Sequence, residues 1–135
     1  MLIIMMEKSE RTENYYKNAL VLAYLGDSVF SLYVREHLVK KYACKSNGLN
    51  KLANKVVCAK GQAEIMEQLM LSLNEDELDI VMRARNSHIN SKAKNSTLHE
   101  YSLATQFEAL MGYWYLNNSL DKIQDIFDKY VVERL

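Results

Sequence analysis

The 135-residue sequence contains no proline, only four glycines and only two cysteines. Folds rich in β-hairpins and collagen-like repeats need proline and glycine at their turns, so the shortage of both favours a helical protein. Cys44 and Cys58 have no second cysteine pair and no histidine at ligand spacing. The sequence therefore supports neither a zinc ribbon nor a disulfide framework, and both cysteines are expected to be reduced.

An excess of charge of either sign is also lacking. Seventeen Lys and Arg balance seventeen Asp and Glu, which excludes a uniformly basic nucleic-acid sleeve and an acidic tail. The charges are nevertheless zoned: residues 35–60 hold seven basic residues against one acid, residues 61–80 hold six acids alone, and residues 83–94 hold four unopposed basic residues. Such zones can form a phosphate-facing surface, although solvated helix faces explain any single zone equally well.

No apolar run is long enough to cross a membrane. Residues 1–6 are apolar but too few for the hydrophobic part of a signal sequence, and Glu7 follows them. We therefore expect a cytoplasmic protein without a membrane segment. With 49% hydrophobic and 25% charged residues, the chain can bury a core, and its length fits one domain covering residues 1–135.

Apolar residues recur at helical spacing through most of the chain, which predicts a single all-α domain of five to seven helices. The first half is expected to form a long helix at 15–42 with a cap near Thr12 or Asn14, a turn at 46–48, a second helix from Leu49 and an apolar stripe at 63–73. A helix should then run from the capping pair Asn74 and Glu77 to Asn86, followed by a polar loop at 87–96. The chain should end with a central buried helix at 97–116 and a last helix capped by Ser119.

Two carboxylates stand among apolar residues within these helices. The helical neighbours of Asp27 and Glu108, at three, four and seven residues, are mostly apolar. A buried carboxylate needs a hydrogen-bonding partner, an ion pair or a metal ion, because burying its charge alone costs several kcal/mol. A structural partner, such as a Tyr hydroxyl, and a functional site are both compatible with this pattern.

Gly26 and Gly112 shift this balance toward a functional site. A glycine inside a helix costs about 1 kcal/mol relative to Ala and is often retained where a backbone or a ligand comes close. Two carboxylates on adjacent helices, each near such a glycine, can share a divalent ion. Mg²⁺ suits such a pair because it takes oxygen ligands and is commonly held by only one or two carboxylates. Asp27 and Glu108 are therefore candidate metal ligands for phosphodiester hydrolysis.

Three segments resemble the ribonuclease III family. Residues 22–30, Leu-Ala-Tyr-Leu-Gly-Asp-Ser-Val-Phe, are similar to its signature helix, and residues 101–116, which contain Gln-Phe-Glu-Ala-Leu, are similar to its second catalytic helix. Between them residues 83–86, Arg-Ala-Arg-Asn, resemble the Arg-Gly-Arg-Asn element of the Mini-ribonuclease III branch, which consists of the catalytic domain alone. The resemblance covers roughly residues 15–132.

The resemblance implies an all-helical, homodimeric endoribonuclease that uses Mg²⁺ to cut double-stranded RNA and leaves 5′-phosphate and 3′-hydroxyl ends. In the Mini-ribonuclease III branch, the implied task is trimming the ends of precursor 23S ribosomal RNA. By motif match, Asp27 takes the position of the last metal-linked carboxylate of the signature helix, and Glu108 that of the metal-binding Glu of the second helix. The alternatives are a weakly active or inactive module that binds double-stranded RNA and a helical interaction protein with structural carboxylates.

The sequence departs from the family pattern at several positions. Leu20, Ala23 and Thr105 stand where full-length members carry further acids, which argues against a second protein-held metal site. Ala84 replaces a glycine, and the proline expected in the following loop is missing.

RNA binding is expected of the catalytic domain itself, because the residues after Leu116 suffice for only one helix. The basic and polar region before the second catalytic helix is the expected site, since phosphates and 2′-hydroxyls are the main features read on A-form RNA. The candidate residues are Arg83, Arg85, Asn86, Lys92 and Lys94. Either arginine can instead pair with Glu75 or Asp79.

Overall fold

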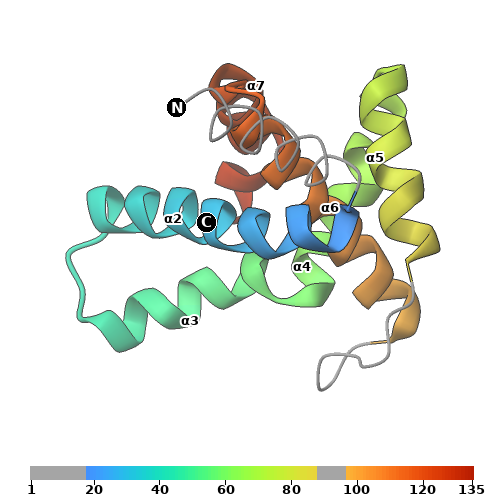
Figure 1. Cartoon of the computed structure of the whole chain (residues 1–135). Helices are drawn as coiled ribbons and strands as arrows, with labels where there is room; N and C mark the ends of the chain where they lie inside the picture. The colour runs from blue at the N-terminus through green and yellow to red at the C-terminus, as the bar shows by residue number, and fades with distance from the viewer. Residues whose placement is uncertain (1–17, 88–96) are drawn as a thin grey trace, which may run out of the picture.

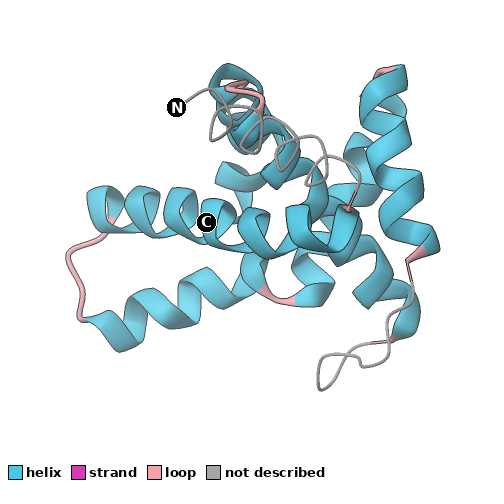
Figure 2. Cartoon of the chain, viewed as in Figure 1, coloured by secondary structure: helices cyan, strands magenta, loops and turns pink. Residues whose placement is uncertain are grey.

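The computed structural model describes residues 18–87 and 97–135 as helices joined by short turns (Figures 1 and 2). No strand occurs within these residues, which confirms the predicted all-α class. The elements are α2 (Ala19–Lys41), α3 (Ser46–Val57), α4 (Ala59–Leu69), the 3-10 turn η1 (Met70–Ser72), α5 (Glu75–Asn86), α6 (Leu98–Leu116), α7 (Leu120–Ile126), the π-helical turn η2 (Phe127–Val131) and the 3-10 turn η3 (Val132–Arg134). None of the helices in this part of the chain has the length and apolar character needed to cross a membrane.

Two boundaries differ from the prediction. Asn18 caps α2, because its side-chain oxygen accepts hydrogen bonds from the N–H groups of Leu20 (3.1 Å) and Val21 (3.3 Å). The helix therefore starts at residue 19 rather than 15, and the expected caps Thr12 and Asn14 lie outside the described residues. The predicted turn at 46–48 is wrong as well, since these residues form the first turn of α3 and the chain reverses through residues 42–45.

The predicted starts of α5 and of the central helix are confirmed by capping boxes. The Asn74 side chain accepts a hydrogen bond from the Glu77 N–H, and the Glu77 carboxylate accepts one from the Asn74 N–H, both at 2.9 Å. Thr97 and Glu100 form the same reciprocal pair at the start of α6. In each box two backbone donors that the helix leaves unpaired are satisfied by side chains, which fixes the first turn.

α6 is the central helix, as predicted. It contacts α2, α4, α5 and α7, and most of its residues from Leu103 to Trp114 are buried (Figure 1). Its Phe107 ring meets Phe30 of α2 edge to face, with ring centroids 4.8 Å apart. The core therefore lies around α6, and the other helices are arranged on its sides.

α2 and α6 cross with their backbones in direct contact at two glycines. A Cβ atom added to Gly26 would overlap the carbonyl oxygen of Glu108, and one added to Gly112 would overlap the carbonyl oxygen of Leu22. Only glycine permits such an approach, which confirms the close contact predicted from these residues. The crossing places Asp27, the residue after Gly26, beside Glu108.

Candidate active site

The two predicted carboxylates come together at the crossing, but they differ in burial. Glu108 is mostly buried on α6, and its carboxyl group is hydrogen-bonded to that of Asp27. Asp27 itself is exposed, so the expectation that both carboxylates are buried is wrong for this residue. α6 covers the side of α2 that carries Gly26 and Phe30, and Asp27 lies at the open edge of this contact.

Glu108 is a much weaker acid than an ordinary Glu side chain. Burial, the negative charge of Asp27 and the hydrogen bond between the two carboxyl groups together raise the pKa of Glu108 from 4.5 to about 8. At neutral pH the protein therefore keeps a proton on Glu108, which the carboxyl group donates to Asp27. Among the described residues, no Lys, Arg or His forms a salt bridge with either carboxylate. Within residues 18–87 and 97–135 the pair therefore has no cationic partner, and the proton on Glu108 lowers the repulsion between the two groups.

The donor set fits a divalent cation that needs few protein ligands. The described residues contain no cluster of three or more His, Cys, Asp or Glu side chains able to hold a metal ion. Mg²⁺ is commonly bound by one or two carboxylates and keeps water or substrate oxygens at its other positions. Two adjacent carboxyl groups, which offer only oxygen ligands, fit this ion.

The positions that carry further acids in full-length family members do not extend the pair. Leu20 is 41% exposed at the surface of α2, and Ala23 is buried. The Thr105 hydroxyl donates a hydrogen bond to the Tyr101 carbonyl oxygen at 2.9 Å, one turn earlier on its own helix. These side chains therefore leave Asp27 and Glu108 as the acidic groups at this point of the crossing.

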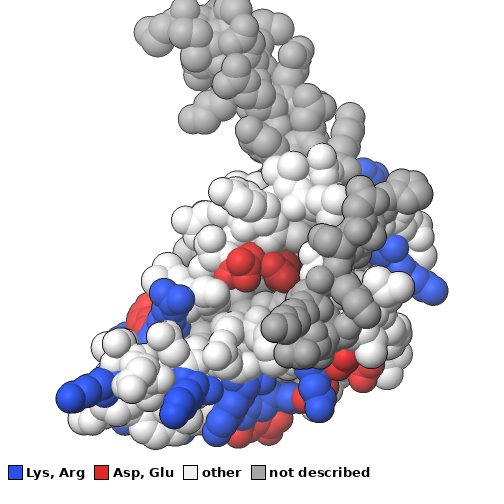
Figure 3. Space-filling model, turned by 90° about the horizontal axis from the view of Figure 1, so that it is seen from below, with Lys and Arg blue, Asp and Glu red and all other residues white. Residues whose placement is uncertain are grey.

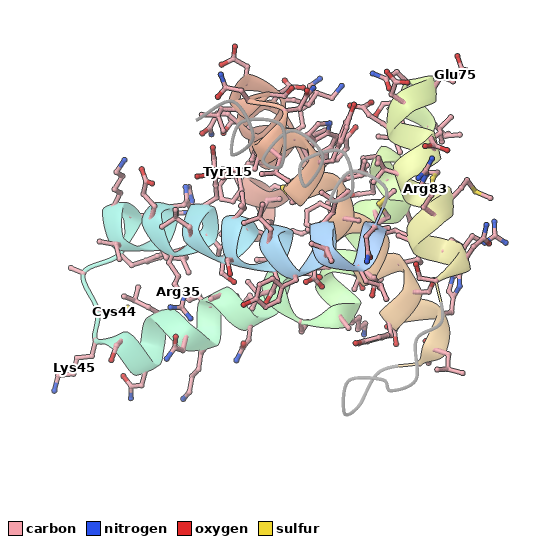
Figure 4. All side chains as sticks on the ribbon, viewed as in Figure 1. Arg35, Cys44, Lys45, Glu75, Arg83 and Tyr115 are labelled. Atoms are coloured by element: carbon pink, nitrogen blue, oxygen red, sulfur yellow. The ribbon has the colours of Figure 1, made fainter. Side chains whose placement is uncertain are left out.

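The candidate RNA-binding residues are placed only in part. Arg83, labelled on α5 in Figure 4, forms a salt bridge with Asp79 at 2.9 Å, which is the alternative that its sequence position leaves open. Arg85 and Asn86 are exposed at the C-terminal end of α5. Lys92 and Lys94 lie outside the described residues.

Further basic residues lie on α3. Lys51 and Lys55 are exposed there. The sequence indicated them only as part of the basic zone at residues 35–60, in which no single residue was distinguishable from the others. Figure 3 shows one face of the molecule, on which acidic side chains lie together within an uncharged surface, while Lys and Arg side chains, with some Asp and Glu among them, gather along its lower edge. Such an arrangement can bind a polyanion by its phosphates while an acidic pair faces the backbone.

A third carboxylate, Glu77, is the most buried acid in the described chain, at 3% exposure. It accepts hydrogen bonds from the Trp114 indole N–H at 2.7 Å and from the backbone of Asn74, and Lys122 lies 3.5 Å away. Its capping position was visible in the sequence, but its contact with Trp114 was not. Glu77 is a structural residue that connects α5, α6 and α7.

Comparison with known proteins gives consistent matches. Residues 20–119 match the Ribonuclease III domain model. The chain is 46% identical over 122 residues to the Mini-ribonuclease 3 of Brevibacillus brevis, covering 90% of this chain and 91% of that protein. It is 40% identical over 112 residues to the Mini-ribonuclease 3 of Streptococcus pneumoniae, covering 81% of this chain and 87% of that protein.

The fold is also similar to a solved structure. The crystal structure of a protein from Fusobacterium nucleatum matches with a TM-score of 0.81 and 30% sequence identity, covering 87% of this chain and 94% of that chain. The region matched by the domain model contains both Asp27 and Glu108.

Proposed function

Because the chain belongs to the ribonuclease III family and is therefore an endoribonuclease, we propose that it hydrolyses double-stranded RNA with Mg²⁺ held by Asp27 and Glu108. The observation that carries this proposal is the contact between the two carboxyl groups on the half-buried side of α6; burial, together with this contact, raises the pKa of Glu108 to about 8. A like-charged pair of this kind is costly unless it holds a proton or a cation. A metal site explains why the fold keeps the two groups together.

The chain's own residues have distinct tasks in this reaction. Glu108 must release its proton before it can bind a cation, so cation affinity rises with pH through the pKa of this residue. Asp27, exposed beside it, is open to the RNA backbone. When bound, Mg²⁺ would supply stabilisation of the negative charge that develops on the phosphoryl oxygens. Hydrolysis of this type leaves a 5′-phosphate and a 3′-hydroxyl.

RNA binding is assigned to the end of α5 and the segment after it. Arg85 and Asn86 are exposed there, and Lys92 and Lys94 follow in the sequence. Arg83 pairs with Asp79 through its Nε, so the negative charge of Asp79 competes with a phosphate for this guanidinium. Lys and Arg neutralise phosphates, while Asn can bind 2′-hydroxyls, so this set suits duplex RNA.

The proposed biological substrate is precursor 23S ribosomal RNA, and the proposed place of action is the cytoplasm. Support comes from the Mini-ribonuclease 3 relatives, which align over most of their own length. Comparing the cleavage of a duplex made from precursor ends with that of an unrelated duplex of equal length tests this assignment.

We also propose a homodimer, because one acidic pair can cut one strand and a two-fold pair of sites can cut both. A candidate contact surface lies just before Asp27 on α2. Leu20, Val21 and Tyr24 are all exposed there, and Tyr24 is 84% exposed, which is unusual for a large apolar side chain. Tyr24→Asp should turn a dimer into a monomer in analytical ultracentrifugation, and an unchanged dimer would place the contact elsewhere.

Cleavage assays on duplex RNA test the metal site. The wild type should shorten the duplex in Mg²⁺ and stop when EDTA is added, while Asp27→Asn and Glu108→Gln should be inactive but folded. Asp76→Asn is the matched control, because Asp76 is an exposed acid in the first turn of α5. If both carboxylates serve one centre, the double variant should lose little more than either single variant.

Two outcomes would contradict the assignment. Cleavage in EDTA at the normal rate would exclude a required divalent ion. Duplex binding by the wild type without any cleavage in Mg²⁺ would instead indicate the alternative function, a module that binds double-stranded RNA without cutting it.

A further inference from the structure

A cleft of about 420 Å³ lies on the second half of α2, where this helix meets the end of α6 and the C-terminal segment formed by α7 and η2. Pockets of this size hold small molecules in other proteins. Neither Asp27 nor Glu108 lines the cleft, so it is separate from the proposed active site. It is called the α2–α7 cleft below, and the chemistry of its walls indicates the kind of molecule that fits.

Aromatic rings form part of the wall of the cleft. Tyr33 of α2 packs on Phe127 of η2, with ring centroids 6.0 Å apart. Tyr115, labelled in Figure 4, lines the cleft from the end of α6 and is 47% exposed. Leu32 and Leu120 line it as well, and both are exposed although they are large and apolar. A ligand with an apolar body would remove these surfaces from water, which favours its binding.

The polar groups of the cleft include phenol and carboxylate oxygens. Burial raises the pKa of the Tyr33 hydroxyl, and the nearby Glu36 carboxylate and Tyr115 hydroxyl raise it further. The three groups therefore lie close together. Among the residues that the structure describes, neither phenol hydroxyl has a hydrogen-bond partner. Asp128 supplies a second carboxylate from the C-terminal segment. All these oxygens can accept a hydrogen bond from a ligand.

The charges of the lining favour a cation. They consist of two carboxylates and one ammonium group, that of Lys40. Lys40 donates a hydrogen bond to Glu36 at 2.7 Å, and Gln124 donates one to Asp128 at 2.9 Å. Both pairs join exposed residues four positions apart, and such surface contacts contribute little to stability and are easily exchanged. A cationic ligand can therefore replace them, whereas an anion meets an excess of negative charge.

We propose that the α2–α7 cleft binds an aliphatic polyamine. Its ammonium groups pair with the carboxylates of Glu36 and Asp128, one from each side of the cleft, and its methylene groups cover the apolar wall. Aromatic faces attract ammonium groups, so the rings add to the recognition of charge. A neutral molecule would cover the rings but give neither carboxylate a new partner. Because three elements meet at the cleft, a bound polyamine connects them and stabilises the folded chain.

Calorimetric titration of the whole chain with spermidine, in EDTA, without RNA and at constant ionic strength, tests the site. The wild type should bind one spermidine per chain, and its melting temperature should rise by a few degrees at saturation. Triethylene glycol has a similar length but carries no charge, so it should neither bind nor raise the melting temperature.

Substitutions in the cleft separate a specific site from general attraction. Glu36→Gln/Asp128→Asn should weaken spermidine binding about tenfold, because two ion pairs at exposed positions are lost. The matched control is Asp121→Asn/Asp125→Asn, which removes the same charge from exposed acids of α7 that do not line the cleft. Tyr115→Leu keeps an apolar side chain without an aromatic face, and it should weaken binding about threefold.

All these variants change exposed side chains, so without ligand they should melt like the wild type. The proposal is overturned if the wild type shows no saturable binding, if both double variants bind spermidine alike, or if Tyr115→Leu binds it like the wild type. Binding of triethylene glycol as strong as that of spermidine would also overturn it. None of these measurements involves RNA, so such a result leaves the proposed ribonuclease function unaffected.

Discussion

Glu77 and Glu108 are two acids withdrawn from solvent, in opposite surroundings. Glu77 receives hydrogen bonds from Trp114 and from a backbone N–H, and an ammonium group lies nearby. Glu108 faces another carboxylate and, within the described residues, no salt-bridge partner. The fold itself therefore surrounds the Glu77 carboxylate with hydrogen-bond donors and an ammonium group. The charge of Glu108 is instead balanced by a proton or by a bound cation.

The difference shows how to separate structural from functional carboxylates. Burial is common to both, so burial alone does not identify a site. The composition of the surroundings does, because a carboxylate among donors stabilises the fold, whereas one beside another acid destabilises it until a cation arrives.

Replacing Glu108 or Glu77 by Gln should show the largest difference between the two acids, and the difference should appear in the rate of RNA cleavage. Glu108→Gln should lower single-turnover cleavage of duplex RNA in Mg²⁺ by about two orders of magnitude or more, because a neutral amide binds Mg²⁺ poorly. Glu77→Gln should stay within about threefold of the wild type, since the amide oxygen can still accept from Trp114. Equal losses in the two variants would remove the distinction between them.

Gly26→Ala should disturb the α2–α6 crossing, where Asp27 and Glu108 meet, and leave the surroundings of Glu77 unchanged. The new methyl group meets the backbone of α6, so the helices must separate, at a cost of about 3 kcal/mol or more in the free energy of unfolding. Cleavage should fall as Asp27 and Glu108 move apart. Chemical denaturation and the cleavage assay report both effects.

Gly48→Ala is the control for this substitution. Its Cβ would meet only the side chain of Cys44, at 3.3 Å, and Cys44 is exposed and can move. Because Ala favours the helix, stability should stay level or rise by up to about 1 kcal/mol. A loss in this variant equal to that of Gly26→Ala would show that any added methyl is harmful.

Truncation of Glu77 should cost stability rather than chemistry. Glu77→Ala leaves the buried Trp114 N–H without an acceptor, which should lower the free energy of unfolding by about 2–3 kcal/mol. Thermal and urea unfolding measure this loss, and Trp114, the only tryptophan, reports it by fluorescence. A variant as stable as the wild type would mean that the contacts of this carboxylate with Trp114, Asn74 and Lys122 do not stabilise the fold.

Apart from the Gly48→Ala control, the smallest expected effect is the pH dependence of stability in EDTA. The pKa of Glu108 is about 8 in the folded protein and near 4.5 in the unfolded chain, so the folded state binds more protons between these values. Stability from this group is present below pH 4.5 and is lost as pH rises through 8. Allowing for the remaining solvent contact, Glu108→Gln should gain about 2 kcal/mol on the wild type between pH 5 and pH 9.

Denaturant unfolding of both proteins at several pH values tests this expectation. Glu77→Gln provides the comparison, because Glu77 lies among donors and not beside an acid. Parallel stability curves for wild type and Glu108→Gln would contradict the shared proton.

Much of the fold could be predicted where local chemistry decides the structure. Asn74 with Glu77 predicted the start of α5, and the apolar residues around Phe107 predicted the central helix. The glycines predicted the helix contact because an interior glycine needs a local reason. These signals lie within a few residues of what they determine.

The exposure of Asp27 could not be predicted, because α2 is apolar on most of its sides. Leu20 and Tyr24 are exposed although the spacing of apolar residues did not separate them from the buried ones. Which side of α2 is covered depends on where α6 crosses, and α6 lies about 80 residues further along the chain. The contact of Trp114 with Glu77, 37 residues apart, was hidden for the same reason.

The backbone contact at Gly26 also determines how sensitive the two acids are to a rotation of α2. If α2 turned by about 5° against α6 around this point, Asp27 would shift by only about 0.1 Å, whereas Lys41, fifteen residues away, would sweep roughly 2 Å. The acids therefore occupy the place where such a rotation is least felt, while α3, attached at the far end of α2, travels furthest. The distance between the two carboxyl groups is therefore the part of this helix pair that is least sensitive to such a rotation.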